Sequence, residues 1–149
     1  MSVEESLAGV WELASFYVER DGARTYPFGE DAGGRIVYDP GGWMSAVLMR
    51  RTIRSQAPGY SLEKARHASL EEKANAYDGY LSYSGRWHLE RDGEATVVVH
   101  TVDLALVPTV IGSSLRRRAR LEGDELVLDY ETYSSRGTRR HFVLRWRRP

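Results

Sequence analysis

Apolar and polar side chains alternate along most of this chain, as they do in β-strands that bury one face and expose the other. The pattern predicts eight strands, of which the longest pair fills residues 80–106. Mostly short connections join neighbouring strands, which favours sequential antiparallel pairing. The expected strands are residues 9–20, 34–39, 43–50, 80–91, 94–106, 113–122, 125–133 and a last strand after the loop at 135–137.

The central hairpin places a histidine inside. Asp92-Gly93 is typical of a two-residue type I′ turn, and counting outward from it sets His100 on the buried face opposite Gly85. An ionisable ring beside a residue without a side chain is either a hydrogen-bonded core group or part of a pocket. The same register pairs Trp87 with Val98, Tyr83 with Val102 and Leu81 with Leu104, all facing inward.

The remaining turns fix further sets of inward side chains. A three-residue loop at 40–42, the dipeptide Gly123-Asp124 and the loop at 135–137 each bring apolar residues face to face, which supports these registers. In the first strand we take the face of Trp11 as inward, because a large aromatic ring packs well only inside. The inward sets are Trp11, Leu13, Ser15 and Tyr17; Ile36 with Ala46 and Tyr38 with Met44; Leu121 with Leu126, Ala119 with Leu128 and Arg117 with Tyr130; then Tyr130 with Phe142, Leu128 with Leu144 and Leu126 with Trp146.

Eight antiparallel strands with alternating faces can close into an up-and-down barrel, which leaves no unpaired edge strand. The alternative is a sandwich of two sheets, but sandwiches usually need Greek-key crossovers, which short connections do not favour. A chain of 149 residues is the size of one domain. We therefore expect an all-β fold, a closed eight-stranded antiparallel barrel formed as a single domain by residues 1–149.

One segment has the pattern of a helix. Ser69 and Glu72 have the spacing of a capping box, and an apolar stripe follows at Leu70, Ala74 and Tyr77. A single amphipathic helix in a strand-rich chain needs an apolar surface to cover its stripe. We expect this helix to lie across an open end of the barrel.

Composition narrows the classes of function. The 21 basic and 21 acidic residues give a formal net charge of zero, which argues against nucleic acid or an anionic membrane as the main partner. The absence of cysteine excludes disulfides, thiolate metal sites and cysteine nucleophiles. Residues 1–8 lack the apolar stretch of a secretory signal, and no run approaches the ~20 apolar residues of a membrane span. We therefore expect a cytoplasmic protein.

The arginine-rich run at 116–118 suggests nucleic-acid binding at first sight. Its register gives another explanation, because Arg116 faces Glu131 and Arg118 faces Asp129 on the outer face of the sheet. Such cross-strand pairs form an ordinary solvated ion ladder. We therefore expect exposed arginines and no nucleic-acid surface.

A set of short motifs runs along nearly the whole chain: Gly9-Val10-Trp11, Tyr26-Pro27-Phe28-Gly29, Gly34-Arg35-Ile36-Val37-Tyr38, Gly42-Trp43-Met44-Ser45-Ala46, Asp78-Gly79-Tyr80, Tyr83-Ser84-Gly85, His100, Pro108 and Gly112. In their order and spacing these motifs resemble the bacterial lipocalin-like domain family of small barrels. The resemblance implies a closed barrel with an internal cavity for a small, mostly apolar molecule. Some members and related barrels look like tailoring enzymes of secondary metabolism, including cyclases. Thr101 stands where the family often has a second histidine, and the register turns it outward.

Three inward side chains are the candidate catalytic residues. His100 is either a core histidine bonded to a tyrosine or a carbonyl, or a base in the pocket. Arg117 lies on an apolar stripe, where it either holds a carboxylate or enolate oxygen of a ligand or stacks on Trp11 at the closed end. Together with Tyr83, these groups could move protons or stabilise negative charge. The candidate ligand-binding residues are Ser15, Tyr17, Tyr38, Met44, Trp87 and Tyr130.

Two functions fit this cavity. The first is an enzyme that needs no cofactor and promotes cyclisation or isomerisation of a hydrophobic small molecule. The second is a carrier that binds such a molecule and does no chemistry. Of the four histidines only His100 faces inward, so the sequence indicates no metal site. The oligomeric state stays open, a homodimer included.

Overall fold

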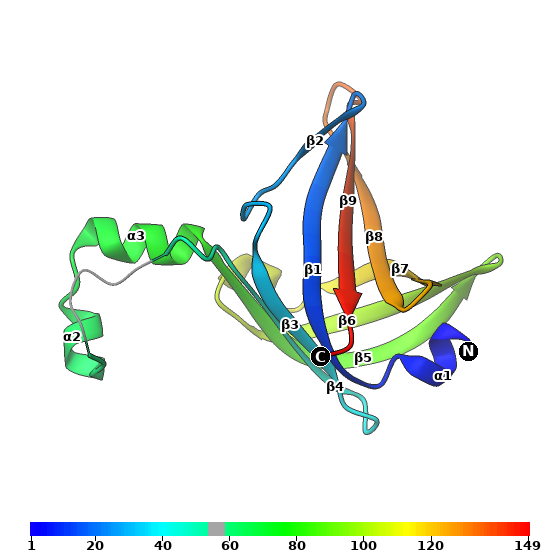
Figure 1. Cartoon of the computed structure of the whole chain (residues 1–149), viewed down its shortest axis with the longest axis horizontal. Helices are drawn as coiled ribbons and strands as arrows, with labels where there is room; N and C mark the ends of the chain where they lie inside the picture. Colours follow the sequence, from blue (N-terminus) through cyan, green and yellow to red (C-terminus); the bar gives the residue numbers. More distant parts are fainter. Residues whose placement is uncertain (54–58) are drawn as a thin grey trace.

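Residues 1–53 and 59–149 are described by the computed structural model, and within them nine strands form one antiparallel sheet that closes on itself (Figure 1). Neighbouring strands pair in chain order, and β1 also pairs with β9, so that eight strands complete a barrel. The short β2 extends the end of β1 as an extra strand. The strands are β1 (Gly9–Arg20), β2 (Ala23–Thr25), β3 (Gly33–Tyr38), β4 (Trp43–Met49), β5 (Tyr80–Asp92), β6 (Ala95–Ala105), β7 (Ser114–Glu122), β8 (Glu125–Tyr133) and β9 (Arg139–Arg147). The prediction of a closed eight-stranded barrel is confirmed.

Three hairpins have the registers that their turns predict. Tyr38 pairs with Met44 across β3 and β4, and Ala119 pairs with Leu128 across β7 and β8. Across β8 and β9, three inward pairs agree with the prediction: Tyr130 with Phe142, Leu128 with Leu144 and Leu126 with Trp146. Most of these side chains belong to one apolar cluster inside the barrel.

The central hairpin pairs two residues away from the expected register. His100 lies opposite Trp87 rather than Gly85, because the turn residues are Gly93 and Glu94. Gly93 has a φ of 61° at the first central position, which a type II′ turn reserves for glycine. Since side chains alternate with a period of two, a shift of two residues leaves every face unchanged. His100 is therefore buried as predicted, with a different neighbour.

A β-bulge near Gly85 changes the faces further along the hairpin. The register shifts between Ser84 and Gly85, so that Ser84 pairs with Leu104 and Tyr83 with Ala105. Leu104 consequently turns outward and is 67% exposed, so its predicted inward pairing with Leu81 is wrong. A Cβ atom on Gly85 would lie 1.9 Å from the carbonyl oxygen of Thr101. Glycine is thus required here by the approach of the facing backbone, and not to leave room beside His100.

A second bulge lies in β1, between Leu13 and Ser15. Trp11 and Leu13 face the barrel interior, but beyond the bulge Phe16 faces inward instead of its neighbours. Tyr17 packs on the outside against Val127 and Val143. The inward orientation predicted for Ser15 and Tyr17 is therefore wrong, because one extra residue moves the rest of a strand to the opposite face.

The predicted helix forms, but it does not cover the barrel. Helix α3 (Leu70–Asp78) begins after Ser69, whose side chain accepts a hydrogen bond from the backbone of Glu72, and it ends at Gly79. Neither α3 nor the separate helix α2 (Leu62–Arg66) has a buried residue. Figure 1 shows both helices standing away from the strands. The expectation that this helix closes an end is wrong.

The end of the barrel is covered by the N-terminal segment instead. Helix α1 (Val3–Ser6) has Ser2 in a capping box, and Val3 and the following Leu7 join the core cluster. The carbonyl oxygen of Leu7 accepts a hydrogen bond of 2.9 Å from Nε1 of Trp11.

A single 3₁₀ turn, η1 (Pro108–Val110), connects β6 to β7.

Candidate functional site

A cavity of about 140 Å³ lies inside the barrel. Each of the eight barrel strands contributes to its wall, and the loop before β3 adds Phe28. Most of the wall is apolar, which suits a small organic ligand. The lining residues are Phe16, Phe28, Ile36, Ala46, Leu48, Leu81, Tyr83, His100, Arg117, Leu128, Tyr130, Leu144 and Trp146.

His100 lies in this wall and is bonded to a tyrosine at each ring nitrogen. The hydroxyl oxygen of Tyr38 lies 2.8 Å from Nε2, and that of Tyr83 lies 2.9 Å from Nδ1. Tyr83 lines the cavity, whereas Tyr38 is fully buried and does not. The three side chains form a hydrogen-bonded chain that runs from the core to the cavity surface.

The donor and the acceptor of each hydrogen bond in this series follow from the need to pair every buried O–H and N–H group. Neutral imidazole donates through one nitrogen and accepts through the other. Within the described residues, the Tyr38 hydroxyl has no hydrogen-bond partner besides Nε2 of His100. Because an unpaired buried O–H is costly, Tyr38 donates to Nε2, and Nδ1–H donates to the oxygen of Tyr83. The O–H of Tyr83 is then left to serve as a donor at the cavity surface.

Burial controls the protonation of all three groups. Burial, and to a smaller extent the nearby charge of Arg117, together lower the pKa of His100 to about 3. Burial also raises the pKa of Tyr83 to about 12 and that of Tyr38 well above its ordinary value. At neutral pH the imidazole is therefore uncharged and both phenols keep their protons.

Arg117 brings a positive charge to the cavity wall. Its guanidinium carbon lies 3.7 Å above the ring of Tyr130, which stacks in turn on Phe142 with ring centres 4.7 Å apart. One nitrogen, Nη1, donates a 3.0 Å hydrogen bond to the carbonyl oxygen of Arg116. The interpretation that Arg117 stacks on Trp11 is wrong. The guanidinium of Arg148 stacks there instead, with its central carbon 3.8 Å from the centre of the Trp11 ring.

The structure brings four of the predicted site residues to the cavity: Tyr83, His100, Arg117 and Tyr130. Tyr38 reaches the site only through His100. Met44 and Trp87 face inward but pack in the core, and Trp87 contacts Tyr38 edge-on with ring centres 5.2 Å apart. Ser15 and Tyr17 lie on the outer side of β1, as the bulge requires.

The sequence did not reveal that Phe16 and Phe28 line the wall, or that the polar atom of Trp146 lacks a partner there. In an unbroken strand Phe16 would lie on the face opposite Trp11 and so point outward, and only knowledge of the bulge could have corrected this. Trp146 was placed inward, but its polar atom was not considered. Its Nε1 is buried without a hydrogen-bond partner, the one such side-chain atom found among the described residues. An inward tryptophan facing no predicted acceptor is the signal that was available.

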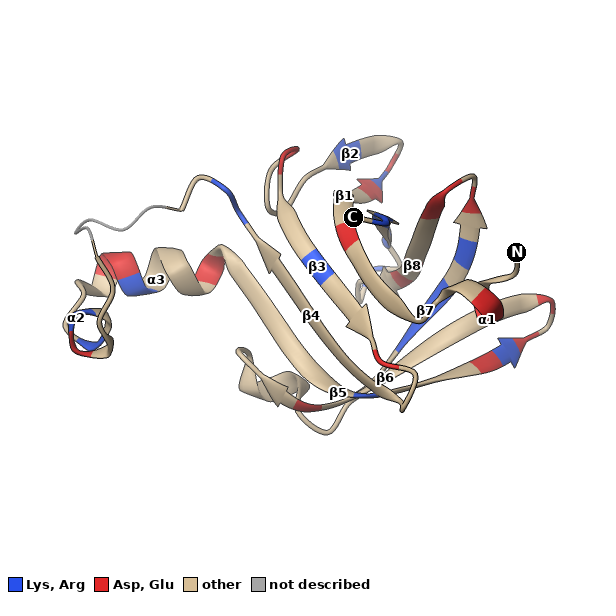
Figure 2. Ribbon diagram, turned by 60° about the horizontal axis from the view of Figure 1, so that its bottom comes forward, with Lys and Arg blue, Asp and Glu red and all other residues tan. Residues whose placement is uncertain are grey.

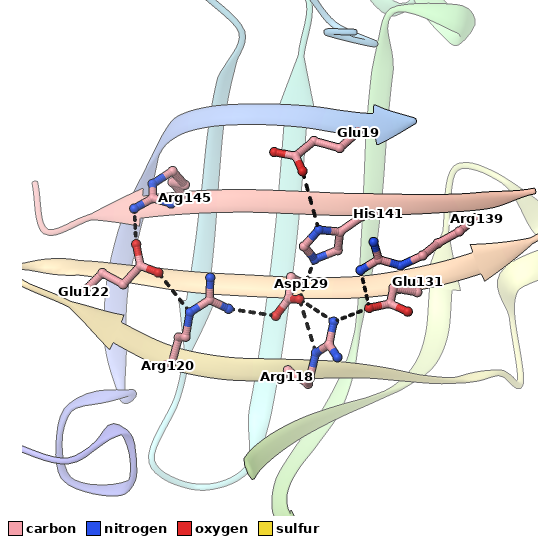
Figure 3. Close-up of polar contacts among 9 residues, drawn as sticks. All are labelled: Glu19, Arg118, Arg120, Glu122, Asp129, Glu131, Arg139, His141 and Arg145. Carbon is pink, nitrogen blue, oxygen red and sulfur yellow. Dashed lines mark hydrogen bonds and ion pairs between the residues drawn. The ribbon is translucent and has the colours of Figure 1, made fainter. Parts of the chain in front are cut away.

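A second polar cluster, on the outside of β7, β8 and β9, serves the fold. Figure 3 shows Asp129 at its centre. The carboxylate is buried and accepts bonds from Arg118 at 2.6 Å, Arg120 at 3.0 Å and His141 at 2.6 Å. Both oxygens are thus occupied, which leaves no free base. The predicted pairing of Arg118 with Asp129 is confirmed.

Other arginines pair on the surface in the same way. Arg116 is exposed as predicted, but its carboxylate partner is Glu90 on β5 and not Glu131, which binds Arg118 and Arg139. Figure 2 shows basic and acidic positions interspersed along the strands. Within the described part of the chain, no three or more His, Asp or Glu side chains gather as ligands for a metal ion. No helix there has the length and apolar character needed to span a membrane.

Comparison with known proteins agrees with this architecture. Residues 8–149 match the family described as a lipocalin-like domain. The chain belongs to the lipocalin-like domain family. Because the match covers nearly the whole chain, the closed barrel and its interior cavity are those of a lipocalin-like domain, a fold suited to holding one small ligand. No curated protein and no solved structure matches the chain.

Proposed function

We propose that this barrel binds a small, mostly apolar molecule and promotes its cyclisation or isomerisation without a cofactor. The observation that carries the proposal is the chain Tyr38–His100–Tyr83, which ends in a phenol at the cavity beside the charge of Arg117. A carrier needs only the apolar walls. A buried, fully bonded polar chain aimed at the ligand space is what chemistry at a ligand oxygen needs.

The groups are suited to stabilising negative charge that develops on an oxygen of the ligand. Tyr83 donates its O–H to that oxygen, and Arg117 supplies positive charge. His100 holds the Tyr83 oxygen through Nδ1–H and so stabilises the phenol as its proton shifts toward the ligand. With its pKa lowered to about 3, His100 is a weak base, so charge stabilisation rather than proton abstraction is the main contribution. Donors of this kind typically contribute about 10²–10³-fold to a rate.

The apolar walls of the cavity make a second contribution to the reaction rate. A cavity of about 140 Å³ is close to the roughly 150 Å³ that accommodates benzene. Such a space restricts a flexible molecule to compact shapes and brings its reacting carbons together, which lowers the entropic part of the barrier.

A ring-sized enone tests this proposal. Cyclohex-3-enone gives up a proton from C2 to a water or buffer base, which leaves a dienolate with negative charge on oxygen, and the dienolate then takes a proton at C4 from the conjugate acid of that base to become cyclohex-2-enone. We expect the protein to accelerate this conversion, followed by the absorbance of the conjugated product, and Tyr83→Phe to lose about 10²-fold of the acceleration.

Tyr133→Phe is the matched control, because Tyr133 is exposed and bonds Glu131 on the outside. It should behave as the wild type. A wild-type rate no faster than that of buffer, or an equal loss in both variants, would favour the carrier function.

A further inference from the structure

The cavity has an unbalanced charge. Among the described residues that line it, Arg117 is the one ionised side chain, and none is Asp or Glu. Within the described residues no carboxylate forms an ion pair with Arg117, whereas Arg145, which is also half-buried, pairs with Glu122 and Glu125. Burial of a cation costs less when an anion pairs with it, and an anionic ligand in this cavity would supply that partner.

The hydrogen-bonding groups of the wall have the same bias. The chain from Tyr38 leaves Tyr83 with an O–H to donate, and both nitrogens of His100 are already occupied. Trp146 lines the cavity, and its buried Nε1–H has no acceptor within the described part of the protein. The indole group can only donate. The wall therefore offers donors and a positive charge, and it needs acceptors.

The stacked guanidinium of Arg117 still has N–H groups that can donate hydrogen bonds to a ligand. The flat face of the guanidinium rests on Tyr130, so its N–H groups project around the edge. The backbone of Arg116 takes one of the five N–H donors. The others have the planar geometry that binds the two oxygens of a carboxylate.

We propose that the ligand of this cavity is a small organic anion, a carboxylate or an enolate attached to an apolar body the size of one ring. Its oxygens bind Arg117 and the hydroxyl of Tyr83, and Nε1 of Trp146 donates to the same group. The inference names the ligand class of the site described under the proposed function and rests on that cavity, but it requires no catalysis.

Equilibrium binding of two ring-sized probes tests the inference. Benzoate and benzyl alcohol share a benzene ring and differ in charge. Calorimetric titration at pH 7 should give a benzoate affinity at least about tenfold higher, as expected of charge-assisted bonds. Arg117→Gln should abolish this preference, and Arg117→Lys, which keeps the charge, should retain part of it.

Arg116→Gln is the matched control, since it removes a neighbouring charge on the outside and should leave the preference unchanged. Trp146→Phe keeps an aromatic ring and should weaken benzoate binding severalfold while leaving benzyl alcohol nearly unaffected. Equal affinities of the two probes for the wild type, or an equal loss in Arg116→Gln and Arg117→Gln, would overturn the proposal.

The outcome separates this inference from the catalytic one. An anion preference that depends on Arg117, without conversion of cyclohex-3-enone, would support the ligand class and refute the proposed catalysis. Conversion of the enone with no preference for benzoate would support catalysis and refute the anion site. The wild-type comparison of the two probes stands even if Arg117→Gln fails to fold.

Discussion

The hydroxyl of Tyr38 lies 2.8 Å from Nε2 of His100, at a depth where neither side chain reaches solvent. Tyr38 thus sets the tautomer of a histidine whose opposite nitrogen holds the Tyr83 hydroxyl at the cavity. Although Tyr38 does not touch the ligand space, it determines that Tyr83 presents a donor there. It is a positioning residue.

Replacement of Tyr38 by phenylalanine should therefore destabilise the protein. The change leaves one nitrogen of His100 buried without a partner, which typically costs about 1–3 kcal/mol of the free energy of unfolding. Urea denaturation at pH 7 measures this loss. Tyr133→Phe, on the surface, should change the free energy by no more than about 0.5 kcal/mol. Equal effects of the two changes would contradict the hydrogen bond.

The lowered pKa of His100 should make stability depend on pH. Above about pH 6.5 the imidazole is neutral in both states, so it contributes no pH dependence. As the pH falls from about 6.5 toward about 3, the unfolded chain takes up a proton that folded His100 refuses. The free energy of unfolding should then fall by up to about 1.4 kcal/mol per pH unit.

His100→Gln isolates this contribution, because glutamine retains hydrogen-bonding groups but does not titrate. Unfolding measured between pH 7 and pH 5 should show a steeper loss of stability in the wild type than in the variant. Parallel curves would mean that the imidazole of the folded protein is protonated in this range.

Two adjacent outer arginines should differ in their importance for stability. Arg118 and Arg116 are both exposed, but Arg118 binds the buried carboxylate of Asp129, whereas Arg116 pairs with exposed Glu90. Loss of a bond to a buried charged group costs about 1.5–3 kcal/mol, while an exposed ion pair contributes about 0–1 kcal/mol. Thermal denaturation should therefore show a larger fall in Tm for Arg118→Gln than for Arg116→Gln. The reverse order would contradict the network in Figure 3.

The bulge in the central hairpin should tolerate no side chain. Gly85→Ala would place its Cβ atom 1.9 Å from the carbonyl oxygen of Thr101, and backbone of a paired strand cannot move aside cheaply. We expect a loss of about 3 kcal/mol or more, measured by urea denaturation. Ser84→Ala, at the next position, should be nearly neutral. A stable Gly85→Ala variant would show that the bulge is mobile.

The alternation of apolar and polar residues determines which face of a strand a side chain occupies, but it does not reveal where a bulge lies. Alternation has a period of two, so it placed His100 inward even though the register of its hairpin was wrong by two residues. A bulge adds one residue, and no sequence pattern distinguishes Ala14 or Asp103 as the extra one. Tyr17 and Leu104 were misplaced for that reason.

Two site features depended on tertiary contacts that local patterns do not encode. The stripe of α3 predicted a packed helix, yet the end of the barrel is covered by Val3 and Leu7, whose single helical spacing is too short to predict a packed helix. Arg117 and Arg148 are both basic residues near aromatic rings, and only the folded barrel decides which ring each contacts.

The long connection between β4 and β5, which contains α2 and α3, should slow the folding of the barrel. Met49 and Tyr80 pair directly across β4 and β5, so the 30 residues numbered 50 to 79 must be gathered into a closed loop before those strands can meet. Replacing them with a two-residue turn would remove about 2 kcal/mol of loop-closure entropy. Because neither helix buries a residue, the barrel would lose little packing, and the shortened chain should reach the native state faster.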